Sequence, residues 1–352
     1  MSIIPEAVRF CFPAAPIGSA ANPDLPLYTR NDSTIPNKGR GKIRDEEEER
    51  VAATVKATYK TVFASYAIDW IFIFALWGLL VVLNRSGGHK REFSLNDISI
   101  QHSFAEHERV PPHLLAFVSI GIPLIVLVPI SVFIARNAWD SHNAVVGVLM
   151  SYTMAGVVTQ IIKMSVGRPR PDLISRCLPV AGATDSPVFG LSTVDICTNT
   201  DLFILNDGFK SFPSGHSSLS FAGLGFLSLY LAGKMHLWDI RGHRTRAWAA
   251  LSPLLGGAMV AISRTADNRH HWQDVLIGSL LGLFVAWVSY RTYYPRLTHR
   301  QCHLPLAPRA DPDAFEDFDL DGEGGTVARE GVRLLSEERE GRQSEEQLAW
   351  RS

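Results

Sequence analysis

Six apolar blocks separated by polar segments limit what this chain can fold into more than any other feature of its sequence. A helix needs roughly 20 apolar residues to cross the hydrocarbon core of a bilayer. The fourth and fifth blocks are short and contain Gly and Ser, so either one alone would equally suit a core helix of a water-soluble protein. Six blocks in one chain instead favour a membrane bundle, in which small residues allow close helix packing. The blocks cover about residues 62–83, 114–135, 144–162, 219–232, 248–262 and 275–290.

The pattern therefore predicts an all-α protein, with a six-helix transmembrane bundle over residues 61–292. The flanking segments differ in composition. Residues 1–60 contain many Pro, Asn, Gly and charged residues, and residues 293–352 are polar and acidic. Such segments bury too little apolar surface to fold, so we expect a disordered tail on each side of the bundle. Prolines interrupt the first twenty residues, which predicts that no cleavable signal peptide is present.

Composition argues against several other classes of protein. The net charge of -1 gives no reason to expect nucleic acid as a partner. Four cysteines in 352 residues are too few for a disulfide-rich scaffold. No CxxC or Cys/His spacing indicates a zinc site. Cys177 and Cys197 share one predicted loop, where a disulfide and two free thiols both remain open.

Positive charges near the ends of the blocks predict how the bundle is inserted. Lys and Arg are enriched in short cytoplasmic segments of membrane proteins. They precede the first block and follow the second, fourth and sixth, which places both termini in the cytosol. The residues are Arg40, Lys42, Arg44, Arg50, Lys56, Lys60, Arg136, Lys234, Arg241, Arg244, Arg246, Arg291, Arg296 and Arg300.

Three clusters of polar residues lie at the ends of predicted helices. The first is KMSVGRPRPD, residues 163–172, at the end of the third block. The second is PSGH, residues 213–216, just before the fourth block. The third is SRTADNRHHWQD, residues 263–274, between the fifth and sixth blocks. With six spans, all three clusters face the same side of the membrane, whichever way the protein is inserted.

The cations and the helix start within these clusters suit a phosphate group. Lys163, Arg170 and Arg264 place three positive charges at one membrane face, and arginine presents a planar fork that matches phosphate oxygens. Ser214 and Gly215 open a helix, where free backbone N–H groups and the helix dipole favour an anion. These five residues are the candidate phosphate-binding residues.

The same clusters supply groups for catalysis. His270 and Asp274 are four residues apart at the head of a helix, so they share a face. A carboxylate in that position can orient an imidazole and stabilise its cationic form, as in a Ser-His-Asp triad. His216 provides a second imidazole that can donate a proton near neutral pH.

Each feature also has a structural explanation when it is taken alone. Lys163 could extend its amine from a helix end to the membrane interface. The PSGH segment could be only a turn and helix cap, and His270 with Asp274 could be a structural pair. Their joint occurrence at one membrane face argues for a functional site.

The three clusters together resemble the signature of the type 2 phosphatidic acid phosphatase family, the lipid phosphate phosphatases. That signature is Lys, six residues and Arg-Pro; then Pro-Ser-Gly-His; then Ser-Arg, five residues, His, three residues and Asp. The chain matches every position. The strings VGRPRPD and RHHWQD resemble the fungal diacylglycerol pyrophosphate phosphatase branch. The resemblance implies a phosphatase core like that of the vanadate-dependent haloperoxidases.

The resemblance also implies a mechanism and a substrate class. His270 would attack phosphorus to form a phosphohistidine, Asp274 would orient it, and His216 would protonate the leaving oxygen. The cations would replace the metal ions used by other phosphoryl-transfer enzymes, so neither metal nor cofactor is expected. The expected partner is a lipid phosphate delivered within the membrane. For these roles the spacing favours Arg170, His270 and Arg264 over the neighbouring Arg168, Arg269 and His271.

Two alternatives remain open from the sequence. One is a lipid transporter or channel, whose charges would line a pathway across the bilayer. The clustering of the charges at one face, not at several depths, argues against it. The other is a phosphatase of the same superfamily that acts on a soluble phosphate ester.

Overall fold

A computed structural model describes residues 66–238, 244–299 and 301–306. The predicted N-terminal tail, residues 1–60, lies outside the described residues, as do residues 307–352. Within the described part, Ile71–Pro305 belong to one compact unit. The arrangement below concerns that unit.

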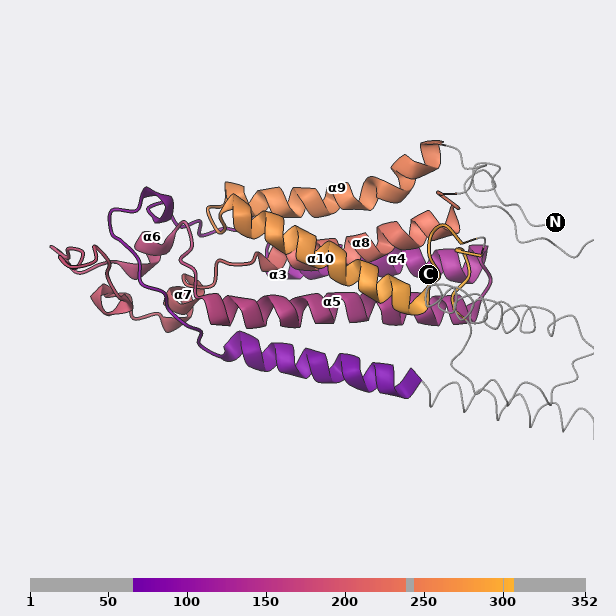
Figure 1. The fold of residues 1–352 in the computed structure, drawn as a ribbon, viewed down its shortest axis with the longest axis horizontal. Coiled ribbons are helices and arrows are strands. Elements are labelled where there is room, and N and C mark those ends of the chain that lie inside the picture. The colour runs from indigo at the N-terminus through magenta and orange to yellow at the C-terminus, as the bar shows by residue number, and fades with distance from the viewer. Residues whose placement is uncertain (1–65, 239–243, 300, 307–352) are drawn as a thin grey trace, which may run out of the picture. The chain divides into compact units, whose positions relative to one another are not determined.

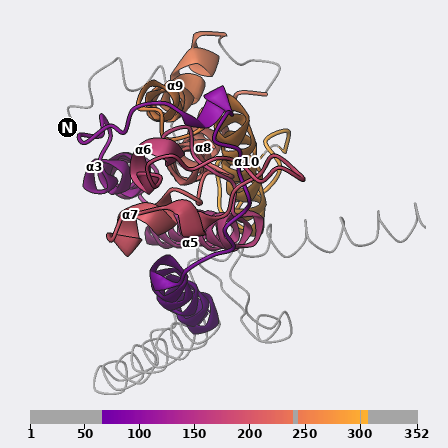
Figure 2. The same cartoon turned by 90° about the vertical axis from the view of Figure 1, so that its left-hand side faces the viewer.

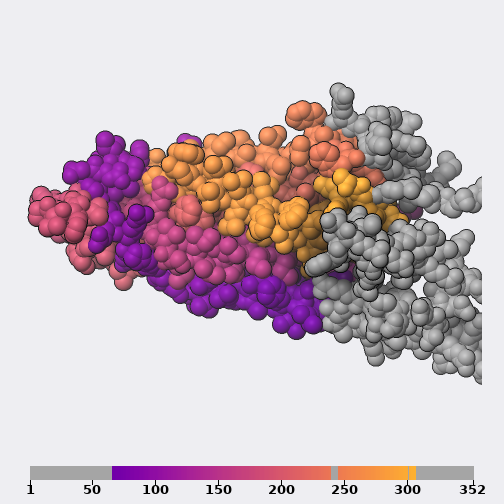
Figure 3. Space-filling view, in the orientation of Figure 1, coloured from indigo at the N-terminus to yellow at the C-terminus, as the bar shows by residue number. Residues whose placement is uncertain are grey.

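Helices form the framework of this unit. The first helix of the unit is formed by residues 71–85, the larger part of helix Tyr66–Arg85. The second apolar block forms a mixed helix made of α3 (Pro112–Ala116), the π-helical η2 (Phe117–Gly121), α4 (Ile122–Pro129) and the π-helical η3 (Ile130–Ile134). The longer helices α5 (Ala138–Val166), α8 (Gly215–Lys234), α9 (Arg244–Ala266) and α10 (Trp272–Tyr293) follow. Figure 1 shows them running alongside one another, and Figure 3 shows α5 and α10 adjacent on one face.

Five helices are long and apolar enough to cross a membrane. They are Tyr66–Arg85, Pro112–Ile134, Ala138–Val166, Thr245–Ala266 and Trp272–Tyr293. Large apolar side chains such as Phe74, Leu255, Met259 and Phe284 are exposed on these helices, as expected of surfaces that face lipid. The chain is an integral membrane protein with an all-α fold.

Helix α8, the fourth predicted span, is not among these five. Its sequence carries many Ser and Gly residues, which lower its hydropathy. This composition suits the position of α8 in the bundle. The helix packs against α5, α9 and α10, and most of its side chains are buried in the protein, so few of them need to be apolar enough to face lipid. At 20 residues it is about 30 Å long, enough to cross the hydrocarbon core. The predicted count of six spans therefore remains a prediction for this one helix.

Local sequence fixes both ends of α5. The side chain of Asn137 accepts a hydrogen bond from the backbone N–H of Trp139 at 2.9 Å, which caps the first turn. Gly167 ends the helix with a φ of 60°, a left-handed conformation that glycine adopts without strain. A Cβ at this position would lie 2.2 Å from the carbonyl oxygen of His89. Gly167 therefore both stops the helix and lets residue 89 approach.

The polar connections at one end of the bundle form a small compact layer of their own. It contains short helices η1 (Ile98–Ile100), α6 (Leu173–Cys177), η4 (Val194–Ile196) and α7 (Leu202–Asp207). Viewed from that end, α6 and α7 lie in front of the long helices (Figure 2). Phe93, Leu173 and Phe209 pack in its core. Cys177 and Cys197 form a disulfide within it, which settles the alternative left open by the sequence.

The segment after α10 packs against the opposite end of the bundle. Tyr294 and Cys302 are buried, and Lys234 donates a hydrogen bond to the carbonyl oxygen of His303. Residues 294–299 and 301–305, which the sequence assigned to the C-terminal tail, are therefore part of the packed structure.

Candidate active site

The three polar clusters come together where the long helices meet the small compact layer. Lys163 lies in the last turn of α5, Ser214 caps α8, and His270 lies in the turn between α9 and α10. Helices α8 and α10 approach closely here, and the lack of a side chain on Gly278 allows it. A Cβ at this position would lie 2.6 Å from the carbonyl oxygen of Ser214. The backbone N–H of Ser214 also donates to the carbonyl oxygen of Asp274 at 2.9 Å.

The start of α8 lies beside Lys163. A Cβ on Gly215 would be 3.6 Å from the side-chain Cε of Lys163, so glycine leaves the amine close to the helix N-terminus. The amine of Lys163 donates to the carbonyl oxygen of Lys210 at 2.6 Å. The hydroxyl of Ser214 is buried and caps the helix by accepting from the N–H of Ser217 at 3.5 Å. The amine of Lys163, the hydroxyl of Ser214 and the backbone N–H groups of the first turn thus lie together at the start of α8.

His270 is buried, with 4% of its surface exposed, and its Nδ1 has no hydrogen-bond partner. Burial lowers the pKa of this imidazole well below its usual range, and the cations of Lys163 and Arg170 lower the pKa further. The ring is therefore neutral near pH 7. A neutral imidazole can act as a nucleophile, and the nearby cations would attract an anionic electrophile.

Asp274 is fully buried and makes more contacts than the sequence suggested. Its Oδ1 pairs with Arg168 Nη1 at 2.6 Å, and its Oδ2 accepts a hydrogen bond from the hydroxyl of Ser211. His271 contacts Oδ2 through its backbone N–H at 3.3 Å and its Nδ1 at 3.4 Å. Nδ1 of His270 faces the same oxygen at 4.0 Å, beyond hydrogen-bond distance.

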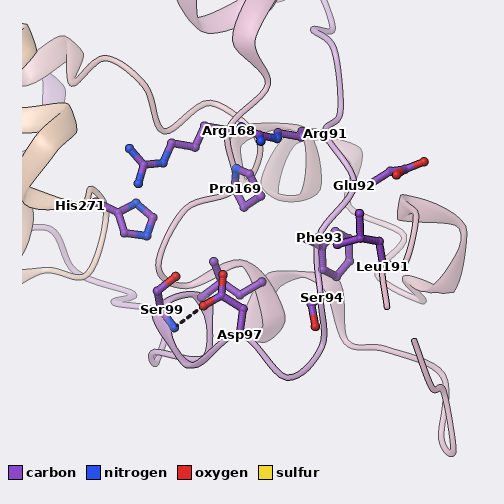
Figure 4. Close-up of a pocket in the computed structure, with 11 residues that line it drawn as sticks. Arg91, Glu92, Phe93, Ser94, Asp97, Ser99, Arg168, Pro169, Leu191 and His271 are labelled. Carbon is purple, nitrogen blue, oxygen red and sulfur yellow. Dashed lines mark hydrogen bonds between the residues drawn. The ribbon is translucent and has the colours of Figure 1, made fainter. Parts of the chain in front are cut away.

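Arg168 and His271 therefore touch the carboxylate directly, although the spacing of the signature leaves them out. Both also line a neighbouring pocket of about 240 Å³, together with Arg91 and Asp97 (Figure 4). Figure 4 shows the side chains of Arg168 and His271 next to each other at one side of this pocket.

Arg170 and Arg264 are each held by carboxylates that the sequence did not single out. Arg170 Nη2 pairs with Asp207 Oδ1 at 2.7 Å. Arg264, with 1% of its surface exposed, pairs through Nη2 with Asp267 Oδ2 and through Nη1 with Glu108 Oε2, both at 2.8 Å. The guanidinium of Arg170 keeps the pKa of Asp207 below its usual range despite the burial of that carboxyl, which alone would raise it.

Residues 104–110, which we call the strap, cross this end of the bundle. Ala105 accepts a hydrogen bond from Arg269 Nη2 at 2.9 Å, and Val110 accepts one from His216 Nε2 at 3.0 Å. The backbone N–H of Arg109 donates to Asp267 at 3.0 Å. The strap fixes the ring of His216 by one nitrogen and leaves the other free.

Comparison with known proteins adds to this geometry. A model of the PAP2 superfamily matches residues 144–297. Lipid phosphate phosphatase 2 of Arabidopsis thaliana is 36% identical over 264 residues, which are 75% of this chain and 85% of that protein. The chain belongs to the PAP2 superfamily. Diacylglycerol pyrophosphate phosphatase 1 of Saccharomyces cerevisiae is 36% identical over 232 residues, 63% of this chain and 76% of that protein. No solved structure matches the chain.

The predicted resemblance to lipid phosphate phosphatases and fungal diacylglycerol pyrophosphate phosphatases is therefore confirmed, and this PAP2 protein is a phosphatase. The matched region contains all eight predicted site residues. Glu108 lies outside it, in a loop with no motif, so no sequence signal identified it. Asp207 and Asp267 lie inside it, and the need of buried arginines for counter-charges was the only available clue.

Proposed function

We propose that this PAP2 phosphatase hydrolyses phosphate monoesters and pyrophosphates of membrane lipids through a phosphohistidine at His270. One observation carries the proposal. The buried imidazole of His270 faces the carboxylate of Asp274 at the end of a membrane helix bundle, and burial together with the charges of Lys163 and Arg170 lowers its pKa. The relatives are named as lipid phosphate and diacylglycerol pyrophosphate phosphatases, which supports a lipid substrate.

His270 attacks phosphorus through Nε2, because Nδ1 faces Asp274. An approach of about 1 Å would bring Nδ1 within hydrogen-bond distance of the carboxylate. The negative charge of Asp274 then stabilises the imidazole as it becomes cationic in the transition state. Arg168 and Ser211 hold the carboxylate in place while this happens.

His216 protonates the leaving oxygen. Its Nε2–H donates to the carbonyl of Val110, so the ring acts as the acid in its doubly protonated form. Water then attacks the phosphohistidine with His216 as base, which releases inorganic phosphate.

The phosphoryl oxygens are held by fixed groups of the protein. Lys163, Arg170 and Arg264 supply positive charge, while Ser214 and the N–H of Gly215 supply hydrogen bonds at the start of α8. Preorganised donors of this kind stabilise the charge that builds up in the transition state. In this proposal they do the work that metal ions do in other phosphoryl-transfer enzymes.

The test exploits the different roles of the two histidines. His270→Ala should abolish turnover for every substrate, because no phosphoenzyme forms. His216→Ala should lower turnover of phosphatidic acid by roughly 10²–10⁴-fold, the usual contribution of general acid catalysis. The same variant should lose much less with p-nitrophenyl phosphate, whose leaving group needs little protonation. Steady-state rates of the purified full chain on both substrates measure this contrast.

Four outcomes would contradict the proposal. A phosphoryl group trapped on His216 would reverse the roles of the histidines. Appreciable cleavage of p-nitrophenyl phosphate by His270→Ala would do the same. Turnover of soluble phosphate esters but of no lipid phosphate would favour the soluble-substrate alternative, and lipid movement across vesicles without hydrolysis would favour a transporter.

We also propose that the site faces the non-cytosolic side of its membrane. The positive charges of the sequence place both termini inside, and the three clusters lie at the ends of the helices away from those charges. Single cysteines introduced between residues 180 and 200, in a chain in which the other cysteines are replaced, can be probed with an impermeant thiol reagent. Labelling from the cytosol in sealed organelles would overturn this placement.

A further inference from the structure

The carboxylate of Glu108 bridges two buried arginines at the active site. Its Oε2 lies 2.8 Å from Arg264 Nη1, and its Oε1 lies 3.3 Å from Arg269 Nη2. The same Oε2 is 3.8 Å from Nε2 of His216. Carboxylates and phosphates bind the guanidinium fork in the same way. The position of this carboxylate is therefore an anion-binding position formed by two arginines beside the general acid.

Arg269 has no role in the family signature, yet it is 94% buried, with 6% of its surface exposed. Its guanidinium lies over the ring of Phe104 at 4.6 Å, and its Nε has no hydrogen-bond partner. Leaving a buried donor unpaired costs about 1–3 kcal/mol. A buried arginine with a free N–H, held at an anion position, points to a ligand that completes its contacts.

Arg269 also adjoins the phosphate-binding arginine of the signature. Asp207 pairs with Arg170 at 2.7 Å, and its other oxygen lies 3.8 Å from Arg269 Nη1. Two anion positions are thus adjacent. One lies near His270, Lys163 and Arg170, and the other is the position that Glu108 occupies between Arg264 and Arg269.

A lipid pyrophosphate has two adjacent anionic groups, whereas a phosphate monoester has one. In the proposed mechanism the terminal phosphate lies at His270 and the leaving group lies toward His216. The leaving group of a monoester is an uncharged alcohol, but that of a pyrophosphate is a second phosphate. We propose that Arg269 binds this lipid-side phosphate, which displaces the carboxylate of Glu108, and that Arg269 thereby determines the preference for lipid pyrophosphates.

The chemistry of the step balances with the groups present. His270 Nε2 forms a bond to the terminal phosphorus as the bond from that phosphorus to the bridging oxygen breaks. The electron pair stays on the bridging oxygen, which becomes an oxygen of the leaving phosphatidate and accepts the proton of His216. Water then cleaves the phosphohistidine and returns a proton to His216. Arg269 acts on the leaving phosphatidate, whose negative charge rises as the bond breaks.

This inference rests on the proposed function, and its test compares two lipids with the same acyl chains. The measured quantity is kcat/KM of the purified full chain for diacylglycerol pyrophosphate and for phosphatidic acid in mixed micelles. Arg269→Gln should lower the value for the pyrophosphate lipid about 10–100-fold more than the value for phosphatidic acid, as expected for loss of one charge-assisted hydrogen bond. Arg269→Lys should recover part of that difference.

Glu108→Gln provides a second, opposite test. It keeps the size of the side chain but removes the charge that competes with the lipid-side phosphate. Its KM for the pyrophosphate lipid should fall, and its KM for phosphatidic acid should change little. The matched controls are Arg85→Gln and Glu106→Gln, at exposed positions of which Glu106 is in the strap itself. Neither control should alter the ratio between the two lipids.

The outcomes separate this inference from the proposed function. A wild-type chain that hydrolyses neither lipid would contradict the proposed function. A wild-type chain that hydrolyses both, with an unchanged ratio in Arg269→Gln, would overturn the role of Arg269 alone. If Arg269→Gln loses all activity, the Glu108→Gln result decides, and an unchanged KM for the pyrophosphate lipid then overturns the inference.

Discussion

At one end of α5 the buried carboxylate of Asp140 is enclosed by partners. Its Oδ2 lies 2.8 Å from the amine of Lys234 and accepts from the hydroxyl of Tyr230 at 2.7 Å, and its Oδ1 accepts from the hydroxyl of Tyr294 at 3.0 Å. At the other end of the same helix lies the His270 site. There Arg170 Nε, Arg269 Nε and His270 Nδ1 are buried without hydrogen-bond partners.

The difference concerns how complete each cluster is. The charged atoms of Asp140 and Lys234 have their partners within the protein, so the pair joins α5, α8 and the segment after α10. The buried hydroxyl of Tyr290 and Nδ1 of His303 at this end have no hydrogen-bond partner, but neither belongs to the charge pair. At the His270 site, cations are held by carboxylates from four separate segments, and several N–H groups remain unpaired. Unpaired buried donors destabilise a fold by about 1–3 kcal/mol each. We infer that the Asp140 end contributes to stability, whereas the His270 end is arranged for an anionic ligand.

The largest effect should come from Asp274→Asn. This change removes the charge that orients Arg168 and faces His270. The corresponding change in a Ser-His-Asp triad lowers kcat about 10⁴-fold, so we expect a loss of about 10³–10⁴-fold with little change in melting temperature. Turnover and thermal unfolding of the purified variant check this, with the exposed Asp195→Asn as control. A loss of less than tenfold would show that the carboxylate is structural, and the comparison would fail.

At the Asp140 end, a substitution should lower stability and leave catalysis nearly unchanged. Asp140→Ala leaves the amine of Lys234 buried without its carboxylate, which should destabilise the protein by about 3–5 kcal/mol. The kcat of molecules that remain folded should stay near wild type. The double variant Asp140→Leu with Lys234→Met should recover much of the stability, because an apolar pair has no charge to desolvate.

Unfolding in detergent, measured together with turnover per folded molecule, checks this prediction. A folded Asp140→Ala variant with strongly reduced kcat would contradict it. So would a double variant that is no more stable than Asp140→Ala, because the ion pair would then not be the source of the loss.

The two ends also differ in how far the sequence predicted them. The apolar blocks predicted the helices because a bilayer imposes a fixed length and composition on each span. The site residues were predicted because Lys163, Arg170, His216 and His270 occur in a characteristic order and spacing.

Contacts between distant segments could not be predicted in this way. Nothing in the sequence around Glu108 shows that its carboxylate reaches Arg264, 156 residues away. The pairing of Asp140 with Lys234 and Tyr294 likewise depends on tertiary packing. Helix α8 is another case. Its low hydropathy follows from its enclosed position among other helices, and that position could not be predicted from its own sequence.

A smaller effect concerns pH. Burial, followed by the cations of Lys163 and Arg170, lowers the pKa of His270 well below its usual 6.5. Because the proposed mechanism uses the neutral ring as nucleophile, kcat/KM should persist as the pH falls through 6.5 and decline only below it. Lys163→Met removes one of these cations, so the pKa should rise and the acidic limb should move to higher pH, whatever the loss of absolute rate. A pH profile of kcat/KM with its acidic limb above 6.5 in the wild type would contradict this assignment.

The smallest effect should come from removing metal ions. The proposed site neutralises the phosphate with cations that are covalently part of the chain, so a chelator has nothing to withdraw that the chemistry needs. Phosphate release from phosphatidic acid in excess EDTA should equal that in its absence, whereas Arg264→Gln should reduce the rate strongly under both conditions. EDTA would remove positive charge supplied by a bound metal ion, whereas Arg264→Gln removes positive charge supplied by the protein itself. Comparing the two shows which of them the His270 end uses. Loss of activity in EDTA that magnesium restores would mean that the unpaired site recruits a metal ion. The contrast with the complete charge pair at Asp140 would then arise from a missing metal and not from a missing substrate.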